Sequence, residues 1–308
     1  MFAFLFFRLE FPTRRLSRAA AATYLALTAC TNAGESPAAA PGLVDDYGVA
    51  IGGTTAAQRI ISLNPTTTEI LFALGAGERV IGRSRWDQWP VEARTVPEVG
   101  DAIRPSVERI LAARPDLVVL YASGDNRAAA SALSAAGIAV VALRIDRLAD
   151  FDRAVRTLGL LTGLEAAADA AIDSVGRSLA GVREAMRFAP RPRVFVHVWD
   201  NPLMAIGGGS YLSELIEIAG GHNVYAERPE PSPQVSFEDL VRLEPQVILA
   251  APAEAARLRT DARWVDVRAV REGRVLAYDT TLVARPSMRL GEAARALALL
   301  LHPGAVLP

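Results

Sequence analysis

The pattern of apolar and polar positions divides the chain into short strands and longer helices. Short apolar runs bounded by polar, Gly or Pro residues predict strands at 59–63, 79–82, 117–121, 138–143, 193–199, 247–250 and 275–278. Apolar positions at helical spacing predict helices at 67–74, 126–136, 150–188 and 288–301. Strands that alternate with helices are typical of parallel sheets with helices on their faces, so we predict an α/β fold.

One helix–turn–strand pattern occurs twice, 130 positions apart, at 106–119 and at 236–249. Each copy begins with Ser, has Glu two residues later and Pro nine residues after the Ser, and continues into an apolar strand. We therefore predict two lobes of similar build, which present Glu108 and Glu238 at the same structural place. Many solute-binding proteins are made of two like lobes with a ligand cleft between them.

The segment between the two predicted lobes has a different character. Residues 150–188 are rich in Ala, Leu and Arg, contain no Pro and keep helical spacing, with a possible kink at Thr162–Gly163. We predict an N-terminal lobe over 59–147, one long connecting helix over 148–189 and a C-terminal lobe over 190–308. The predicted fold class is α/β, with two similar parallel-sheet lobes bridged by one long helix.

Two helix starts carry local signals. Thr66 and Glu69 have the spacing of a capping box, in which each side chain satisfies a backbone donor of the other residue. Residues 207–209 are three glycines that precede Ser210. Because they lack the Lys and the spacing of a phosphate-binding loop, we interpret them as a turn followed by a Ser-capped helix.

The N-terminal residues have the pattern of a bacterial lipoprotein signal peptide. Arginines precede the apolar run 19–29, which is too short to span a bilayer by itself. The run ends in Leu-Thr-Ala-Cys, and Cys30 resembles the lipidated cysteine of a lipobox. We expect residues 1–29 to be a signal peptide, Cys30 to carry the lipid and residues 30–58 to form a flexible tether. The alternative is that Cys30 is a free thiol without this role.

Composition narrows the function classes. The chain has 308 residues, 51% of them hydrophobic, and a formal net charge of -1, which gives no argument for nucleic acid as a partner. Its single cysteine excludes a disulfide within the chain. The three histidines, His197, His222 and His302, lack metal-ligand spacing with a cysteine or a carboxylate. We therefore expect no direct metal site and no cofactor, so that any metal would arrive inside a chelate.

Short motifs along the chain resemble, in order and spacing, those of class III (helical-backbone) substrate-binding proteins of ABC importers. The resemblance covers about residue 59 to the end and is nearest to cobalamin-binding members. The matching motifs are Ile61-Ser62-Leu63-Asn64-Pro65, Thr68-Glu69, Leu74-Gly75, Trp89-Pro90, Val99-Gly100, Pro115-Asp116-Leu117-Val118, Gly137-Ile138, Gly220-Gly221-His222-Asn223-Val224, Gln234-Val235-Ser236 and Arg285-Pro286-Ser287.

The resemblance implies a lipid-anchored, monomeric protein on the extracytoplasmic side of the membrane. Such a protein captures a metal chelate, here cobalamin or a related corrinoid, and delivers it to an ABC permease. A ferric siderophore is the alternative ligand within the family. An extracytoplasmic hydrolase or chelatase on a related two-lobed fold is the alternative from another class. The chain has no G-x-S-x-G elbow and no histidine with a recognisable catalytic partner, so we expect no enzyme.

Aromatic residues at the ends of predicted strands are the first ligand-binding candidates, because α/β folds bind ligands there. They are Trp86, Trp89, Tyr121 and Trp199. The resemblance aligns Trp86 and Tyr121 with cleft aromatics of cobalamin binders, whereas Trp89, followed by Pro, fits a structural role equally well. Two further cleft tryptophans of those binders fall at about Ala102 and Ser232, which leaves the identity of the ligand open.

Charged residues supply the other candidates. Arg285 and Arg289 lie in the last strand-to-helix loop, where a guanidinium could bind a phosphate, carboxylate or amide oxygen of a ligand. The alternative for both is a surface ion pair. For Glu108 and Glu238 the resemblance implies docking onto arginines of the permease. The alternative is that each glutamate only stabilises the positive end of its helix.

Overall fold

The computed structural model describes residues 43–52 and 56–308. The first lobe, here called the N-lobe, contains a five-stranded parallel sheet of order β3-β2-β1-β4-β5. Its strands are β1 (Ile60–Ser62), β2 (Val80–Ser84), β3 (Glu98–Gly100), β4 (Leu117–Tyr121) and β5 (Ala139–Leu143). Its helices are α1 (Pro65–Ala73), α2 (Val107–Ala113) and α3 (Arg127–Ala135), with short 3-10 turns at Gly77–Arg79 and Val91–Thr95.

The N-lobe sheet is buried on both faces. Along β1, Ile60 enters one hydrophobic core and Ile61 enters another, and along β4 Val118 and Val119 divide in the same way. Successive residues of a strand point to opposite faces, so a sheet covered by helices on both sides needs apolar residues at every position. This explains why the predicted strands are continuous apolar runs and not alternating ones.

The second lobe, here called the C-lobe, has a mixed sheet of order β10-β9-β6-β7, with β8 also paired to β6. Its strands are β6 (Arg193–Asp200), β7 (Leu203–Ala205), β8 (His222–Asn223), β9 (Val247–Ala250) and β10 (Val275–Ala277). Its helices are α6 (Tyr211–Ile218), α7 (Phe237–Arg242), α8 (Pro252–Leu258), α9 (Arg268–Arg271), α10 (Thr280–Val283) and α11 (Leu290–Leu301), with a 3-10 turn at Ala262–Trp264.

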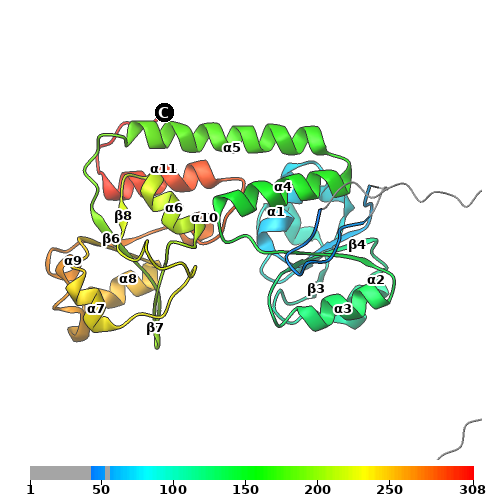
Figure 1. Ribbon diagram of the computed structural model, residues 1–308, viewed down its shortest axis with the longest axis horizontal. Coiled ribbons are helices and arrows are strands. Elements are labelled where there is room, and N and C mark those ends of the chain that lie inside the picture. The colour runs from blue at the N-terminus through cyan, green and yellow to red at the C-terminus, as the bar shows by residue number, and fades with distance from the viewer. Residues whose placement is uncertain (1–42, 53–55) are drawn as a thin grey trace, which may run out of the picture. The chain divides into compact units, whose positions relative to one another are not determined.

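The segment predicted as one connecting helix over 148–189 is two helices, α4 (Leu148–Thr162) and α5 (Glu165–Ala185). Gly163 lies in the left-handed region (φ 68°) and ends α4, which only glycine does without strain. The bridging helix itself is α5, which packs against α4 and also against α6 and α11 of the C-lobe (Figure 1). The predicted fold class, two lobes joined by a long helix, is confirmed with a shorter helix than expected.

The repeated segment has the same structure in both lobes. Ser106 accepts a hydrogen bond from the Arg109 amide at the start of α2, and Ser236 accepts one from the Asp239 amide at the start of α7. Both helices are followed by a residue with positive φ, Arg114 at 49° or Glu244 at 43°. The prediction that two lobes share one structural unit is therefore confirmed by matching caps and matching turns.

Part of the predicted tether is packed on the N-lobe. The carboxylate of Asp45 accepts a hydrogen bond from the backbone amide of Ala142 (3.1 Å), and the hydroxyl of Tyr47 donates to the carbonyl of Ser123. The prediction of a tether up to residue 58 is thus wrong for 43–52. The composition of this segment did not indicate that Asp45 and Tyr47 bind backbone groups far away in the sequence. The predicted signal peptide and Cys30 lie outside the described residues.

The start of α1 also differs from its prediction. The helix begins at Pro65, and the side chain of Asn64 accepts a hydrogen bond from the Thr66 amide (3.0 Å). The Thr66 hydroxyl donates instead to the carbonyl of Pro286 in the C-lobe (2.9 Å). Glu69 is 3% exposed and does not reach back to the helix start, so the capping box is wrong. The predicted cap at Ser210 is confirmed, since its hydroxyl accepts from the Leu212 amide.

Candidate ligand-binding site

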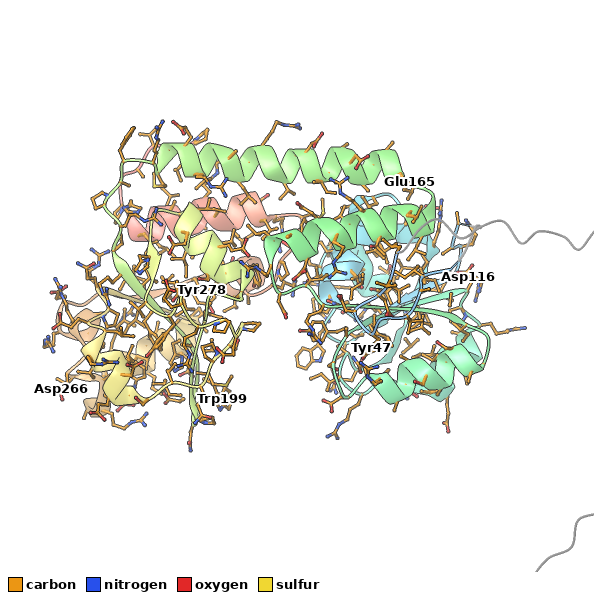
Figure 2. All side chains as sticks on the ribbon, in the orientation of Figure 1. Tyr47, Asp116, Glu165, Trp199, Asp266 and Tyr278 are labelled. Atoms are coloured by element: carbon orange, nitrogen blue, oxygen red, sulfur yellow. The ribbon has the colours of Figure 1, made fainter. Side chains whose placement is uncertain are left out.

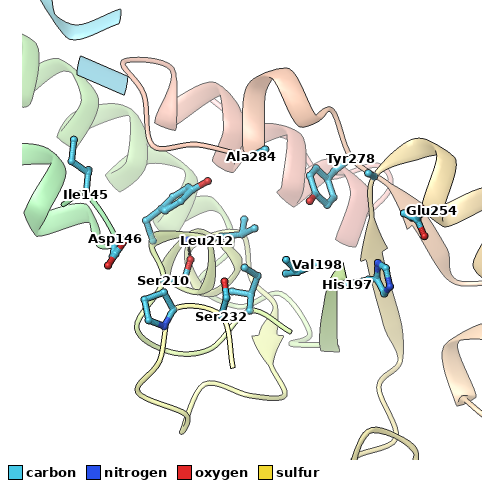
Figure 3. Close-up of a pocket in the computed structure, with 14 residues that line it drawn as sticks. Ile145, Asp146, His197, Val198, Ser210, Leu212, Ser232, Glu254, Tyr278 and Ala284 are labelled. Atoms are coloured by element: carbon cyan, nitrogen blue, oxygen red, sulfur yellow. Dashed lines mark hydrogen bonds between the residues drawn. The ribbon is translucent and has the colours of Figure 1, made fainter. Parts of the chain in front are cut away.

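A cavity of about 330 Å³ lies at the carboxyl ends of the C-lobe strands (Figure 3). The end of β6, the residue after β9 and the residue after β10 all contribute to its wall, as expected for a ligand site in an α/β fold. The segment that enters α4 closes it on the side of the N-lobe. The lining residues are Ile145, Asp146, His197, Val198, Ile206, Ser210, Tyr211, Leu212, Pro231, Ser232, Ala251, Glu254, Tyr278 and Ala284.

A second cavity, of about 380 Å³, lies at the carboxyl ends of β1 and β4 in the N-lobe. Tyr121 lines it and donates a hydrogen bond from its hydroxyl to the Asp146 carboxylate (3.1 Å). Asp146 in turn lines the first cavity, and its backbone carbonyl accepts from the Tyr211 amide of the C-lobe. The remaining lining residues are Leu63, Asn64, Pro65, Ala102, Ile103, Ser123 and Asp125.

A third cavity, of about 310 Å³, shares His197, Val198 and Glu254 with the first. Trp199 lines it and is 62% exposed at the tip of the β6–β7 hairpin (Figure 2). The three cavities thus form a series from Tyr121 to Trp199, which we call the cleft. The cleft brings Tyr121 and Trp199, two of the predicted aromatic residues, to its two ends.

The other two predicted aromatics lie outside these three cavities. Trp86 follows β2, is 56% exposed and has the Arg85 guanidinium 5.5 Å from its ring centre. The guanidinium of Arg289 lies over the ring of Trp89, 4.4 Å from the ring centre. Trp89 therefore takes part in a contact between the N-lobe and the loop before α11.

The two predicted arginines also belong to that contact. The Nε atom of Arg289 lies 3.6 Å from a carboxylate oxygen of Glu69, and another nitrogen of Arg289 donates to the Thr281 carbonyl. Burial raises the pKa of Glu69, and the nearby charges of Arg289 and Arg285 offset this rise only in part. Neither arginine lines the cleft, so their observed contacts favour a structural role.

His197 is a cleft residue that the sequence did not single out as a ligand contact. It is 3% exposed and packs edge-on against the rings of Phe195 and Trp264. Burial lowers its pKa, and the neighbouring carboxylate of Asp200, 3.4 Å away, opposes this effect. His197 is thus a neutral imidazole in the cavity wall at neutral pH.

Asp146 and Glu254 also line the first cavity and were not predicted as ligand-binding residues from the sequence. Burial is the main reason why the pKa of Asp146 is raised, and burial together with the Asp146 charge raises the pKa of Tyr121 to about 12. Neither carboxylate has a motif of its own in the sequence. For Asp146, the only sequence signal is its position three residues after the end of the strand β5.

The two repeated glutamates lie away from the cleft lining. Glu108 and Glu238 are exposed in the first turns of α2 and α7. Their position is compatible both with docking and with stabilisation of the helix ends.

Within residues 43–52 and 56–308, no helix combines the length and the hydropathy needed to cross a bilayer. In the same ranges no three side chains of His, Cys, Asp or Glu are grouped as metal ligands.

Comparison with known proteins places this arrangement among binding proteins. Residues 60–282 match the family described as periplasmic binding protein. A vitamin B12-binding protein of Salmonella paratyphi A is 32% identical over 212 residues, which cover 68% of this chain and 78% of the relative. The crystal structure of a periplasmic vitamin B12-binding protein of Vibrio cholerae superposes with a TM-score of 0.70 at 25% identity, covering 80% of this chain and 96% of that one. A periplasmic haem-binding protein of Pseudomonas aeruginosa gives a TM-score of 0.70 at 26% identity, covering 82% and 95%.

Proposed function

The chain belongs to the periplasmic binding protein family, whose members are extracytoplasmic substrate-binding proteins rather than enzymes, and from this premise we propose that its ligand is cobalamin or a related corrinoid. The protein holds the ligand in the cleft, as a monomer, and passes it to an ABC permease. The relatives named above bind vitamin B12 or haem, which are both large macrocyclic metal chelates.

The observation that carries the proposal is the series of three cavities with an aromatic residue at each end. Each cavity, at about 310 to 380 Å³, is at the small end of the range for a single ligand site. A corrinoid is larger than any one of them and would occupy the series. Ala102 and Ser232, both small, line the cleft and leave room for the macrocycle.

We assign ligand contact to Tyr121 and Trp199, whose rings offer large apolar faces for a macrocycle at modest cost in side-chain entropy. Trp86 is proposed as a third contact at the rim, because its ring is half exposed and it follows a strand of the same N-lobe sheet. Trp89, Arg285 and Arg289 are assigned to the contact between the lobes.

The test is direct binding of cyanocobalamin and cobinamide to the purified protein by isothermal titration calorimetry. Trp199→Ala should weaken binding by about 1–3 kcal/mol, the usual loss for an aromatic anchor that becomes buried when the ligand binds. Phe188→Ala is the matched control, because Phe188 is 89% exposed in the turn after α5 and lies outside the cleft. Absence of binding to both corrinoids would overturn the proposal.

We propose that the exposed glutamates Glu108 and Glu238 dock the protein on the permease. They occupy equivalent places in the two lobes, so a two-lobed permease surface could be contacted symmetrically. Exposed charges at an interface set orientation and association rate with little effect on stability.

We also propose that Cys30 anchors the mature protein to the membrane by a lipid. The support is the lipobox pattern at residues 27–30. Cys30→Ala should move the protein from the membrane fraction to the soluble or unprocessed fraction after cell lysis. An unchanged distribution would contradict the anchor.

A further inference from the structure

The side chains that line the cleft carry an unequal balance of charge. Among the lining residues of the three cavities, the carboxylates belong to Asp125, Asp146, Asp200 and Glu254, and the only guanidinium belongs to Arg257. Asp146 and Glu254 lie at opposite ends of the first cavity (Figure 3). The lining is therefore strongly acidic, although the whole chain has a formal net charge of only -1.

The single lining guanidinium is already neutralised. Arg257 forms ion pairs with Asp200 (2.7 Å), Glu254 (2.8 Å) and Asp261 (3.0 Å). Arg263 joins the same group through Asp200 and Asp261. This group holds three carboxylates against two guanidiniums, so it retains one negative charge and has no cation to spare for an anionic ligand.

The other end of the first cavity is acidic as well. The carboxylate of Asp146 accepts one hydrogen bond, from Tyr121, and has acceptor capacity left. The adjacent cation Arg147 is paired with Glu214 of α6 (3.1 Å). The charges of Asp150 and Asp46 add to burial in raising the Asp146 pKa, and Arg144 acts against them. His197, at the Glu254 end of this cavity (Figure 3), is buried and uncharged at neutral pH.

We propose that the cleft selects its ligand by charge: it admits neutral or cationic metal chelates whose edges present amide N–H donors, and it rejects chelates with peripheral carboxylates. This inference rests on the proposed function and narrows it, because it separates an amide-bearing corrinoid from haem and from anionic ferric siderophores. A ligand amide donates to Asp146 or Glu254, whereas a ligand carboxylate faces like charge in a partly desolvated cavity.

The experiment compares ligands that differ only in charge. Cyanocobalamin is titrated against its separated monocarboxylic acids, in which one peripheral amide is hydrolysed, at pH 7.5 and low salt. The most affected acid should bind at least about ten-fold more weakly than the amide, and no acid should bind more tightly. Haemin and its dimethyl ester form a second pair, in which the ester should bind more tightly.

Two variants test the residues. Asp146→Asn and Glu254→Gln should each reduce the difference between amide and acid to about three-fold or less. Asp173→Asn, an exposed carboxylate of α5 outside the cleft, is the matched control and should leave the difference unchanged. Circular dichroism confirms folding, and if Asp146→Asn does not fold, Glu254→Gln decides alone.

The outcomes separate the two proposals. Equal binding of cyanocobalamin and all of its acids would overturn charge selection and leave the corrinoid proposal standing. A difference that persists in both cleft variants would also overturn it. If no corrinoid binds at all, the proposed function fails, and the haemin pair then decides charge selection: a tighter ester supports it, and equal or tighter haemin overturns it.

Discussion

The two lobes share one structural unit but differ at the strand beside it. In the N-lobe, β2 runs parallel to β1 along its length. In the C-lobe, two short strands occupy the corresponding edge of β6: β8 pairs in parallel with its start, and β7 pairs antiparallel with its end. The antiparallel return extends β6 to Asp200 and places His197 and Trp199 in the cleft wall. The repeated helix–turn–strand unit thus gives the two lobes a common framework. The elements at the other edge of β6, which differ from those of the N-lobe, form much of the cavity wall.

The shared frame extends further than the sequence motif. The side chain of Arg59, which precedes β1, donates to the carbonyls of Ala113 and Arg114. The side chain of Arg193, at the start of β6, donates to the Leu243 carbonyl. Each arginine therefore binds the end of the repeated helix of its own lobe. Elements of common structure carry the two glutamates and also Tyr121 at the end of β4, whereas the β6–β7 hairpin, which has no counterpart in the N-lobe, carries Trp199.

The largest expected effect concerns the glycine loop that only the C-lobe contains. A Cβ atom on Gly208 would lie 1.9 Å from the carbonyl oxygen of Ala226. Because this oxygen belongs to the backbone, it cannot move away without a large cost in free energy. Gly208→Ala should lower the free energy of unfolding by at least about 3 kcal/mol. Gly176→Ala in α5 is the control, because a Cβ there meets no atom within 4 Å, and it should stabilise the helix by up to about 1 kcal/mol. Equal denaturation midpoints for the two variants would contradict the tight fit.

The next effect concerns the contact that joins the lobes. Arg289→Ala removes the counter-charge of Glu69, whose side chain is buried, and should cost about 3 kcal/mol of unfolding free energy in urea denaturation. Replacing both charges, by Glu69→Gln with Arg289→Met, should recover most of this loss. Arg156→Ala breaks an exposed ion pair with Asp169 and should cost no more than about 0.5 kcal/mol. A similar loss of unfolding free energy in Arg289→Ala and Arg156→Ala would show that the buried pair contributes no more to stability than the exposed pair.

A smaller effect is the pH dependence of that contact. The pKa of Glu69 is raised in the folded state, so folded protein binds this proton more tightly than unfolded chain does. The stability of the parent relative to Glu69→Gln should be greatest below the ordinary glutamate pKa of about 4.3 and should fall as pH rises through the raised value. The slope cannot exceed about 1.4 kcal/mol per pH unit, the limit for one proton. A relative stability that rises with pH would contradict the assignment.

The smallest effect on stability and binding is expected for the shared glutamates. Glu108→Arg with Glu238→Arg should change the unfolding free energy by no more than about 1 kcal/mol per site, through the helix dipole, and should leave ligand affinity unchanged. Uptake by the permease in reconstituted vesicles should nevertheless be lost, because repulsive pairs replace attractive ones at the docking surface. Normal uptake would leave helix stabilisation as the sufficient role of both residues.

Much of the frame could be predicted from the sequence, because its signals are local. Continuous apolar runs marked the strands that are buried on both faces, and the repeated Ser, Glu and Pro positions indicated a shared unit. Serine caps depend on residues within a few positions of each other, so the cap at Ser210 could be predicted without a structure. Family motifs pointed to the same two-lobed fold.

Only the tertiary structure decided which of the polar residues meet. Glu69 resembled half of a capping box, but it is buried against Arg289 from the other lobe, and Thr66 bonds to Pro286, 220 residues away. Asp146 has no motif, and it lines the cleft because the chain crosses there between the lobes. Sequence periodicity reports whether a side chain is buried. The partner of a buried charge depends on which loops are brought together when the lobes pack, and that information is spread over the whole fold.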